Sequence, residues 1–195
     1  MEFTARQIEI MEAATQRIDK HGIQNLTIKT LAADINLSEP ALYRHFAGKN
    51  EILLGLLVYF KNEMEERISQ LSFEKDEKAG DRLRKIFNSQ LVTFEQKPAI
   101  VSVIFAESIF HFDKSLSNKV SEIIDSMHKV VHENIKTGQS KNQYSTLIKP
   151  GTMTTIITGG MRMAVMKWKL SGNKSSVEKD GMKVLNGILK MIENK

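Results

Sequence analysis

Apolar residues recur every three or four positions along nearly the whole chain, which is the spacing of one face of an α-helix. The first such stripe contains Ile8, Met11, Ala14 and Ile18. Longer stripes follow, and they cover residues 52–71, 83–94, 99–112, 120–135, 153–170 and 177–192. No segment shows the strict alternation of apolar and polar residues that is typical of a half-buried strand. The pattern predicts an all-α fold with about nine helices.

Helix-ending and helix-capping residues divide the region after the first stripe into short pieces. Gly22 tolerates the left-handed backbone that commonly ends a helix. Thr27 can cap a short second helix over residues 27–35. Asn36 follows that helix, and Asn tolerates left-handed backbone better than most residues other than glycine. These signals predict a helix, a tight turn, and the start of another helix.

The next helix is predicted over residues 38–46. Ser38 can cap it, and Pro40 fits its first turn, where backbone amides have no helical partner. Two short helices joined by a turn of a few residues, with a longer helix before them, are typical of a helix-turn-helix. In that motif the second helix lies in the major groove of DNA.

The helices become longer after about residue 50. The sequence therefore predicts a helix-turn-helix domain over residues 1–50 and a larger helical body over residues 51–195. Gly138 is expected to end the helix over 120–135, and Ser175 with Glu178 is expected to begin the last helix as a capping box. The total of 195 residues suits one compact domain or a small module fused to a larger one.

Composition is that of an ordinary soluble protein, with 41% hydrophobic and 26% charged residues. The chain has no cysteine, which excludes disulfides, thiolate metal sites and a cysteine nucleophile. No apolar segment of signal-peptide length follows the first residues, and Arg162, Lys167 and Lys169 interrupt the most apolar run. We therefore expect a cytoplasmic protein that does not cross a membrane.

The net charge of +5 is unevenly distributed. Residues 1–50 carry six Lys or Arg and six Asp or Glu, so the predicted DNA-binding module has no net charge. Residues 149–195 carry nine Lys or Arg against three Asp or Glu. Because phosphate contacts are local, DNA binding by the first module would depend on cations gathered on one face.

Candidate catalytic and metal sites are sparse. No Ser-His-Asp set, phosphate-binding loop or pair of convergent carboxylates stands out, so we do not expect an enzyme. His128 and His132 lie four residues apart on one helix face, and together with His111 they could bind zinc. We favour the simpler explanation, that these are partly exposed helix histidines beside the stripe that contains Val131. We predict neither a metal nor a cofactor.

Residues 27–53, TIKTLAADINLSEPALYRHFAGKNEIL, resemble the DNA-binding domain of the TetR family of bacterial regulators. Asn36 departs from the glycine that the family usually has in this turn. The rest of the chain is similar in its number of helices, in a Gly-Gln pair and in the run GGMRMAVMKWKLSG. The matched features are Thr27, Leu31–Ala32, Ser38, the Leu42–Tyr43–x–His45–Phe46 core and Lys49.

The resemblance implies a homodimeric transcription repressor that binds a palindromic operator and has a small-molecule pocket in its body. Leu42 and Phe46 are expected in the core. Arg44 could pair with guanine, and Glu39 could accept a hydrogen bond from cytosine. The expected DNA-contacting residues are Lys29, Ser38, Glu39, Pro40, Ala41, Tyr43, Arg44, His45 and Lys49.

Two roles are open for the methionine-rich helix near residues 153–170: the wall of a permissive pocket or a dimer seam at Gly159–Gly160. We favour core or interface, with the last two helices pairing the subunits. The ligand, a small apolar molecule, is expected to contact Phe94, Ile104, Glu107, His111, Met127, Met161 and Trp168.

An alternative function is also implied by the family resemblance. The stretch SEPALYRHFAGK is similar to the nucleoid-occlusion branch of the TetR family, whose members act from DNA on a cell-division protein. That function would place the protein on the nucleoid, with a protein partner in place of a ligand response.

Overall fold

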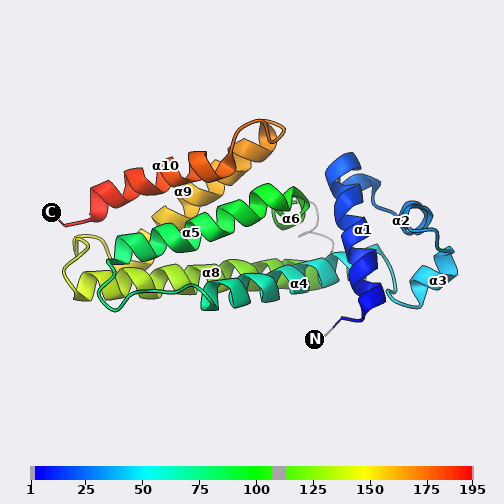
Figure 1. Cartoon of the computed structure of the whole chain (residues 1–195), viewed down its shortest axis with the longest axis horizontal. Coiled ribbons are helices and arrows are strands. Elements are labelled where there is room, and N and C mark those ends of the chain that lie inside the picture. Colours follow the sequence, from blue (N-terminus) through cyan, green and yellow to red (C-terminus); the bar gives the residue numbers. More distant parts are fainter. Residues whose placement is uncertain (1–2, 107–112, 195) are drawn as a thin grey trace. The chain divides into compact units, whose positions relative to one another are not determined.

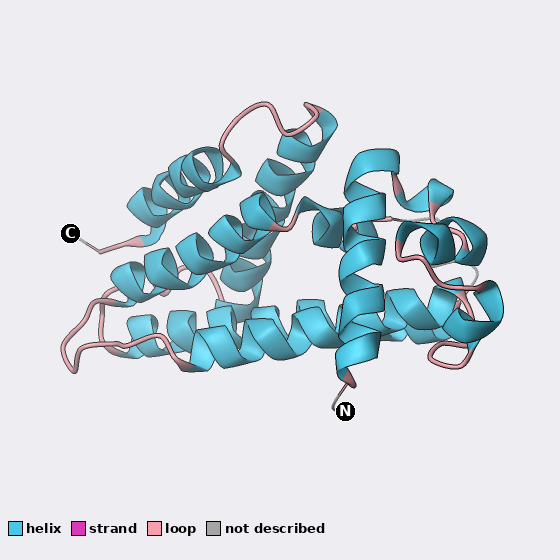
Figure 2. Cartoon of the chain, turned by 45° about the vertical axis from the view of Figure 1, so that its right-hand side comes forward, coloured by secondary structure: helices cyan, strands magenta, loops and turns pink. Residues whose placement is uncertain are grey.

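The computed structural model describes residues 3–106 and 113–194. Within these ranges the chain forms nine α-helices, one 3₁₀ turn and no strand, apart from a single isolated bridge between Tyr144 and Glu193 (Figure 2). The predicted all-α fold is confirmed. The helices are α1 (Ala5–His21), α2 (Ile28–Asp34), α3 (Glu39–Tyr43), α4 (Lys49–Ser69), α5 (Ala79–Gln96), α6 (Pro98–Ile104), α8 (Lys114–Ser140), α9 (Pro150–Leu170) and α10 (Val177–Ile192), and the 3₁₀ turn is η1 (Ile23–Asn25).

The chain divides into two compact units. The first contains Met1–Asn62 and Lys97–Ser121, and the second contains Glu63–Gln96 and Glu122–Lys195. Two of the boundaries fall inside long helices, α4 and α8. The predicted domain boundary at about residue 50 remains a prediction. No helix among the described residues is long and apolar enough to cross a membrane.

In the first unit the capping residues act as the sequence predicts. Gly22 has φ 79°, and its amide donates to the carbonyl oxygen of Ile18 at 2.9 Å. The hydroxyl of Thr27 accepts from the amide of Thr30, and Asn36 has φ 52°. These positions end α1, begin α2 and form the turn between α2 and α3, which Figure 1 draws in blue to cyan.

Helix α3 is shorter than predicted. The hydroxyl of Ser38 accepts from the amide of Ala41, as expected for a cap, but α3 ends at Tyr43 and not near Phe46. The chain turns because Phe46 is drawn into the core while the carboxylate of Glu51 accepts from the amide of Ala47. The amide of Phe46 still donates to the carbonyl of Leu42 at 3.2 Å, but the next amide, that of Ala47, donates to Glu51 at the start of α4.

The core of the first unit gathers apolar side chains from most of its helices. At Gly55 of α4 an added Cβ would lie 3.0 Å from the sulfur of Met11 and 3.3 Å from the ring of Phe46. Glycine therefore allows α4 to lie close to α1. Fully buried members include Ile10, Leu31, Leu42, Ile52, Leu57 and Leu116.

In the second unit α10 packs along both α5 and α9, as Figure 1 shows in green, orange and red. An added Cβ at Gly181 would lie 2.7 Å from Leu91, so α10 and α5 are in close contact. Gly138 does not end a helix as predicted, because α8 continues to Ser140. A glycine is needed at position 138 because the ring of Tyr144 fills the space that a side chain there would occupy.

Two further helix ends differ from the prediction. The cap of α10 is Ser176, whose hydroxyl accepts from the amide of Lys179, and not Ser175. The carbonyl of Ser175 instead accepts from the indole N–H of Trp168 at 2.8 Å. The helix predicted over 99–112 is α6, which ends at Ile104; residues 107–112 lie outside the described ranges.

Candidate nucleic-acid interface

Helix α3 separates buried anchors from exposed polar groups. Leu42 is fully buried and Phe46 is 3% exposed, so both anchor the helix as the sequence predicts. The side chain of Tyr43 between them is 51% exposed. Six of the predicted contact residues are exposed, namely Lys29, Ser38, Glu39, Pro40, Tyr43 and Arg44. The other three are half-buried, namely Ala41, His45 and Lys49.

The exposed groups of α3 are free to bind a partner. The side chains of Glu39, Tyr43 and Arg44 make no hydrogen bond or ion pair with the described residues. Lys29 on α2 makes none with them either. The exposed phenol, guanidinium and ammonium groups can donate to phosphates and base edges, and the exposed carboxylate of Glu39 can accept from a base.

Two contacts from α1 hold the helix-turn-helix in place. The side-chain amide of Gln7 donates to the carbonyl of His45 at 3.2 Å, just after α3. The guanidinium of Arg17 donates to both carboxylate oxygens of Asp34, the last residue of α2, with Nη2 2.8 Å from Oδ1. This hydrogen bond from Arg17 holds the pKa of Asp34 below its usual range.

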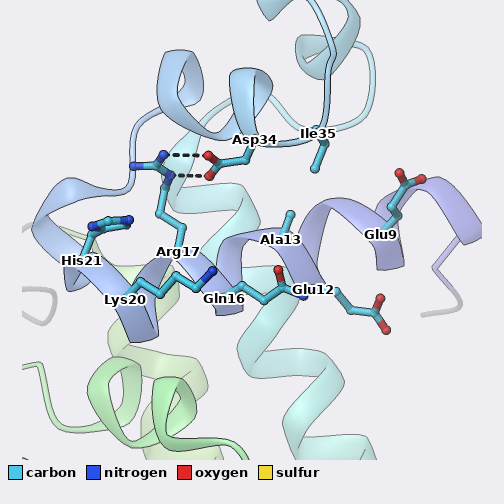
Figure 3. A pocket seen from close by; sticks show the side chains of 9 residues that line it. All are labelled: Glu9, Glu12, Ala13, Gln16, Arg17, Lys20, His21, Asp34 and Ile35. Atoms are coloured by element: carbon cyan, nitrogen blue, oxygen red, sulfur yellow. Dashed lines mark hydrogen bonds and ion pairs between the residues drawn. The ribbon is translucent and has the colours of Figure 1, made fainter.

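The Arg17–Asp34 pair lies in a shallow pocket of about 360 Å³ on α1 and α2. Figure 3 shows the two hydrogen bonds, with Lys20 and Gln16 beside them on α1. The pocket contains none of the predicted DNA-contacting residues. Because the charges and hydrogen-bonding groups of Arg17 and Asp34 are paired with each other, the two residues serve to join α1 to α2.

Lys49 has a partner that the sequence did not indicate. Its ammonium donates to the carbonyl oxygen of Ile23, the first residue of η1, at 2.8 Å. Burial lowers the pKa of Lys49. An ammonium has three N–H donors, so this bond leaves two for a phosphate.

The predicted ligand-contacting residues come from both units of the chain. Ile104 is buried in the first unit, and Met161 and Trp168 are buried in the second. Phe94 and Met127 are half-buried in the second unit. Glu107 and His111 lie outside the described residues. The ligand set therefore remains a prediction.

A second pocket, of about 210 Å³, lies in the second unit beside α5 and α8 and contains none of those residues. Elsewhere in that unit the rings of His128 and His132 are stacked, with centroids 6.5 Å apart, and His132 Nδ1 lies 3.5 Å from the hydroxyl of Thr154. The described residues contain no group of three His, Cys, Asp or Glu side chains that could hold a metal.

Comparison with known proteins identifies the family. Residues 10–56 match the model of bacterial regulatory proteins of the tetR family, and residues 60–191 match the model of the C-terminal region of YsiA-like protein. The second match alone covers more than half of the chain. The chain belongs to the TetR family of bacterial regulators. The DNA-binding, helix-turn-helix character expected from residues 27–53 is thereby confirmed.

Individual relatives are more distant. The nucleoid occlusion factor SlmA of Photobacterium profundum is 30% identical over 124 residues, which are 63% of this chain and 62% of that protein. The match thus spans less than two thirds of the relative's length. The fatty acid degradation regulator FadR of Bacillus halodurans has the same fold, with a TM-score of 0.82, 18% identity and 97% of each chain covered.

A structure of FadR from Bacillus subtilis in complex with stearoyl-CoA also shares the fold. Its TM-score is 0.74 at 17% identity, and the match covers 93% of this chain and 97% of that one.

Replacing Lys49 should affect both stability and DNA binding. In Lys49→Ala we expect a lower melting temperature, because the bond to Ile23 is lost. We also expect a weaker salt dependence of DNA binding. A plot of the logarithm of the association constant against the logarithm of the salt concentration should have a slope less negative by about 0.9 for each phosphate contact removed. Fluorescence anisotropy over a salt series measures the slope. Lys29→Ala, at an exposed site, is the control that should change the slope alone. An unchanged slope in Lys49→Ala would restrict Lys49 to a structural role.

Proposed function

We propose that this protein is a dimeric transcriptional repressor that binds a palindromic operator through α3 and leaves it when a ligand with a long apolar chain binds the body. The observation that carries the proposal is the division of α3 into buried anchors and exposed polar groups that have no partner among the described residues. That division lies inside the segment that matches the tetR family model.

Each exposed group has a chemical role in this proposal. The guanidinium of Arg44 donates to guanine O6 and N7, and the carboxylate of Glu39 accepts from cytosine N4. Tyr43 and His45 contact the DNA backbone or thymine methyl groups, while Lys29 and Lys49 bind phosphates. Ser38, Pro40 and Ala41 form the first turn of α3 and bring the backbone close to the DNA.

The proposed dimer forms through an apolar face on α9 and α10. The side chains of Met163 and Leu170 are 56% and 77% exposed on α9, and that of Met191 is 75% exposed on α10. Gly159 of α9 and Gly187 of α10 face open space, so a second helix can approach closely there. Exposed apolar residues at helical spacing on adjacent helices favour an isologous four-helix interface.

The proposed ligand carries an acidic head group. In the second unit the guanidinium of Arg67 is half-buried and donates to two neutral acceptors, the hydroxyl of Ser89 at 2.8 Å and the side-chain oxygen of Gln90 at 2.7 Å. Burial lowers the pKa of Arg67, but an arginine remains charged. The carboxylate of Glu63 acts against this lowering of the Arg67 pKa, and the guanidinium can also pair with an anionic ligand group. The complex of the similar FadR with stearoyl-CoA supports an acyl-CoA as the ligand class.

The alternative function rests on the similarity to SlmA, a nucleoid occlusion factor. A protein of that kind would bind DNA and act on a cell-division protein, and a small ligand would not be expected to release it. The response of DNA binding to an acyl-CoA therefore distinguishes the two functions.

Replacing Arg44 should relax base preference. In Arg44→Ala we expect operator affinity to fall by about tenfold to a hundredfold, since a bidentate base contact contributes about 1–3 kcal/mol of discrimination. Affinity for random DNA of the same length should change much less. Anisotropy titrations with both DNAs measure this, and Lys20→Ala, an exposed cation of α1, is the control. Equal losses on both DNAs would contradict base recognition by Arg44.

A charge on the apolar face should separate the subunits. We expect Met163→Glu to be monomeric by sedimentation velocity and to lose operator affinity, because carboxylates would be buried at the seam. Leu147→Glu, at an apolar side chain that is 94% exposed in the loop before α9, should remain dimeric. If Met163→Glu sediments as the wild type does, the dimer forms elsewhere.

Stearoyl-CoA should release the operator. We expect it to lower operator affinity, because a ligand shifts the conformational equilibrium only by its different affinities for the two states. Free coenzyme A, which lacks the acyl chain, is the control and should leave the complex intact. Operator affinity that is unchanged at saturating stearoyl-CoA would contradict ligand release and favour the nucleoid-occlusion alternative.

A further inference from the structure

Helix α4 begins with two adjacent residues that bind two different parts of the first unit. The ammonium of Lys49 donates to the carbonyl of Ile23 in η1, at 2.8 Å. The side-chain amide of Asn50 donates to Asp113 Oδ2, at 2.9 Å. Ile23 lies between α1 and α2 of the helix-turn-helix, whereas Asp113 immediately precedes α8. The first turn of α4 is thus bonded on one side to the DNA-binding helices and on the other to the start of α8.

Asp113 uses its two carboxylate oxygens for different purposes. Oδ1 caps α8 by accepting from the amides of Ser115 at 2.8 Å and Leu116 at 3.3 Å, while Oδ2 accepts from Asn50. The hydroxyl of Ser115, and then the amide of Leu116, hold the pKa of Asp113 below its usual range. Leu116 is 1% exposed, so this cap is anchored in the core of the first unit.

We propose that Asn50 and Asp113 are positioning residues for operator binding: their hydrogen bond holds the first turn of α4, and through Lys49 the η1 turn, in the arrangement that presents α3 to DNA. The proposal rests on the function proposed above and names the contact by which the start of α8 acts on the helix-turn-helix. In this proposal a displacement of the α8 cap that breaks the Asn50–Asp113 bond lowers operator affinity.

The effect should appear in DNA affinity and not in overall stability. The Asn50–Asp113 bond lies at the surface, where water can replace either partner, so its loss should cost little of the free energy of unfolding. Base recognition, in contrast, requires donors and acceptors in a narrow range of distance and angle. A small displacement of the η1 turn is therefore costly for binding even where it costs the fold little.

The residue types at the two positions allow an exchange test. In Asn50→Asp two carboxylates face each other, and the bond is lost. In the double variant Asn50→Asp/Asp113→Asn the amide introduced at position 113 can donate to the carboxylate introduced at position 50. Its carbonyl can still cap α8, because Asn and Asp are equally good caps. In Asp113→Asn alone, Asn50 can turn its own amide and accept, so the bond survives.

We expect Asn50→Asp to lower operator affinity by about tenfold, a coupling typical of residues in direct contact. The double variant and Asp113→Asn should bind within about twofold of the wild type, and the melting temperatures of all three should agree with that of the wild type. Asn62→Asp places the same charge on an exposed residue of the same helix and is the control for repulsion from DNA. It should bind as the wild type does.

Three results would overturn the proposal: wild-type affinity in Asn50→Asp, a double variant as weak as Asn50→Asp, or a loss of affinity matched by a fall in melting temperature. A wild-type protein without sequence-specific DNA binding would instead contradict the proposed function itself. Anisotropy titrations and thermal unfolding on the same preparations separate these outcomes.

Discussion

The burial of Leu42 and Phe46 is the interaction on which the exposed polar surface at α3 depends. A helix of five residues such as α3 is not stable alone, because nucleation costs more than so few hydrogen bonds return. Its conformation comes from the two apolar anchors in the core and from the bond between Gln7 and the carbonyl of His45. These contacts fix the helix while its polar side chains stay exposed, which the proposed DNA contact requires.

Contacts within short stretches could be predicted from the sequence. Thr27, Ser38 and Asn36 act through groups within a few residues, so their roles in capping and turning were correctly expected. The end of α3 was placed too late, and the amide of Ala47 just beyond it bonds to Glu51 of the following helix, a contact that the sequence pattern did not indicate. Gly138 was mistaken for a helix end for the same kind of reason: the ring that requires it, Tyr144, belongs to the loop after α8.

In the candidate site, too, contacts between residues close in sequence could be predicted and contacts between distant residues could not. The burial of Leu42 and Phe46 and the exposure of Tyr43 and Arg44 follow from helical spacing, since one turn of helix decides which side chains share a face. The bond from Lys49 to Ile23 has no sequence signal, because it joins a side chain to a backbone carbonyl 26 positions away. The ligand contacts remain a prediction. An apolar stripe has the same spacing whether it lines a cavity or fills a core.

Each level of the structure positions the next. Helix α1 holds the end of α3 through Gln7, and the first turn of α4 is bonded to η1 through Lys49. In the proposed dimer, the paired subunits would set the distance between the two copies of α3. Selection of bound DNA from a random pool tests this most directly. The account predicts enriched palindromes whose half-sites are one helical turn, about 10–10.5 base pairs, apart or a multiple of it. Enrichment of a single unrepeated site, or no enrichment over random DNA, would contradict it.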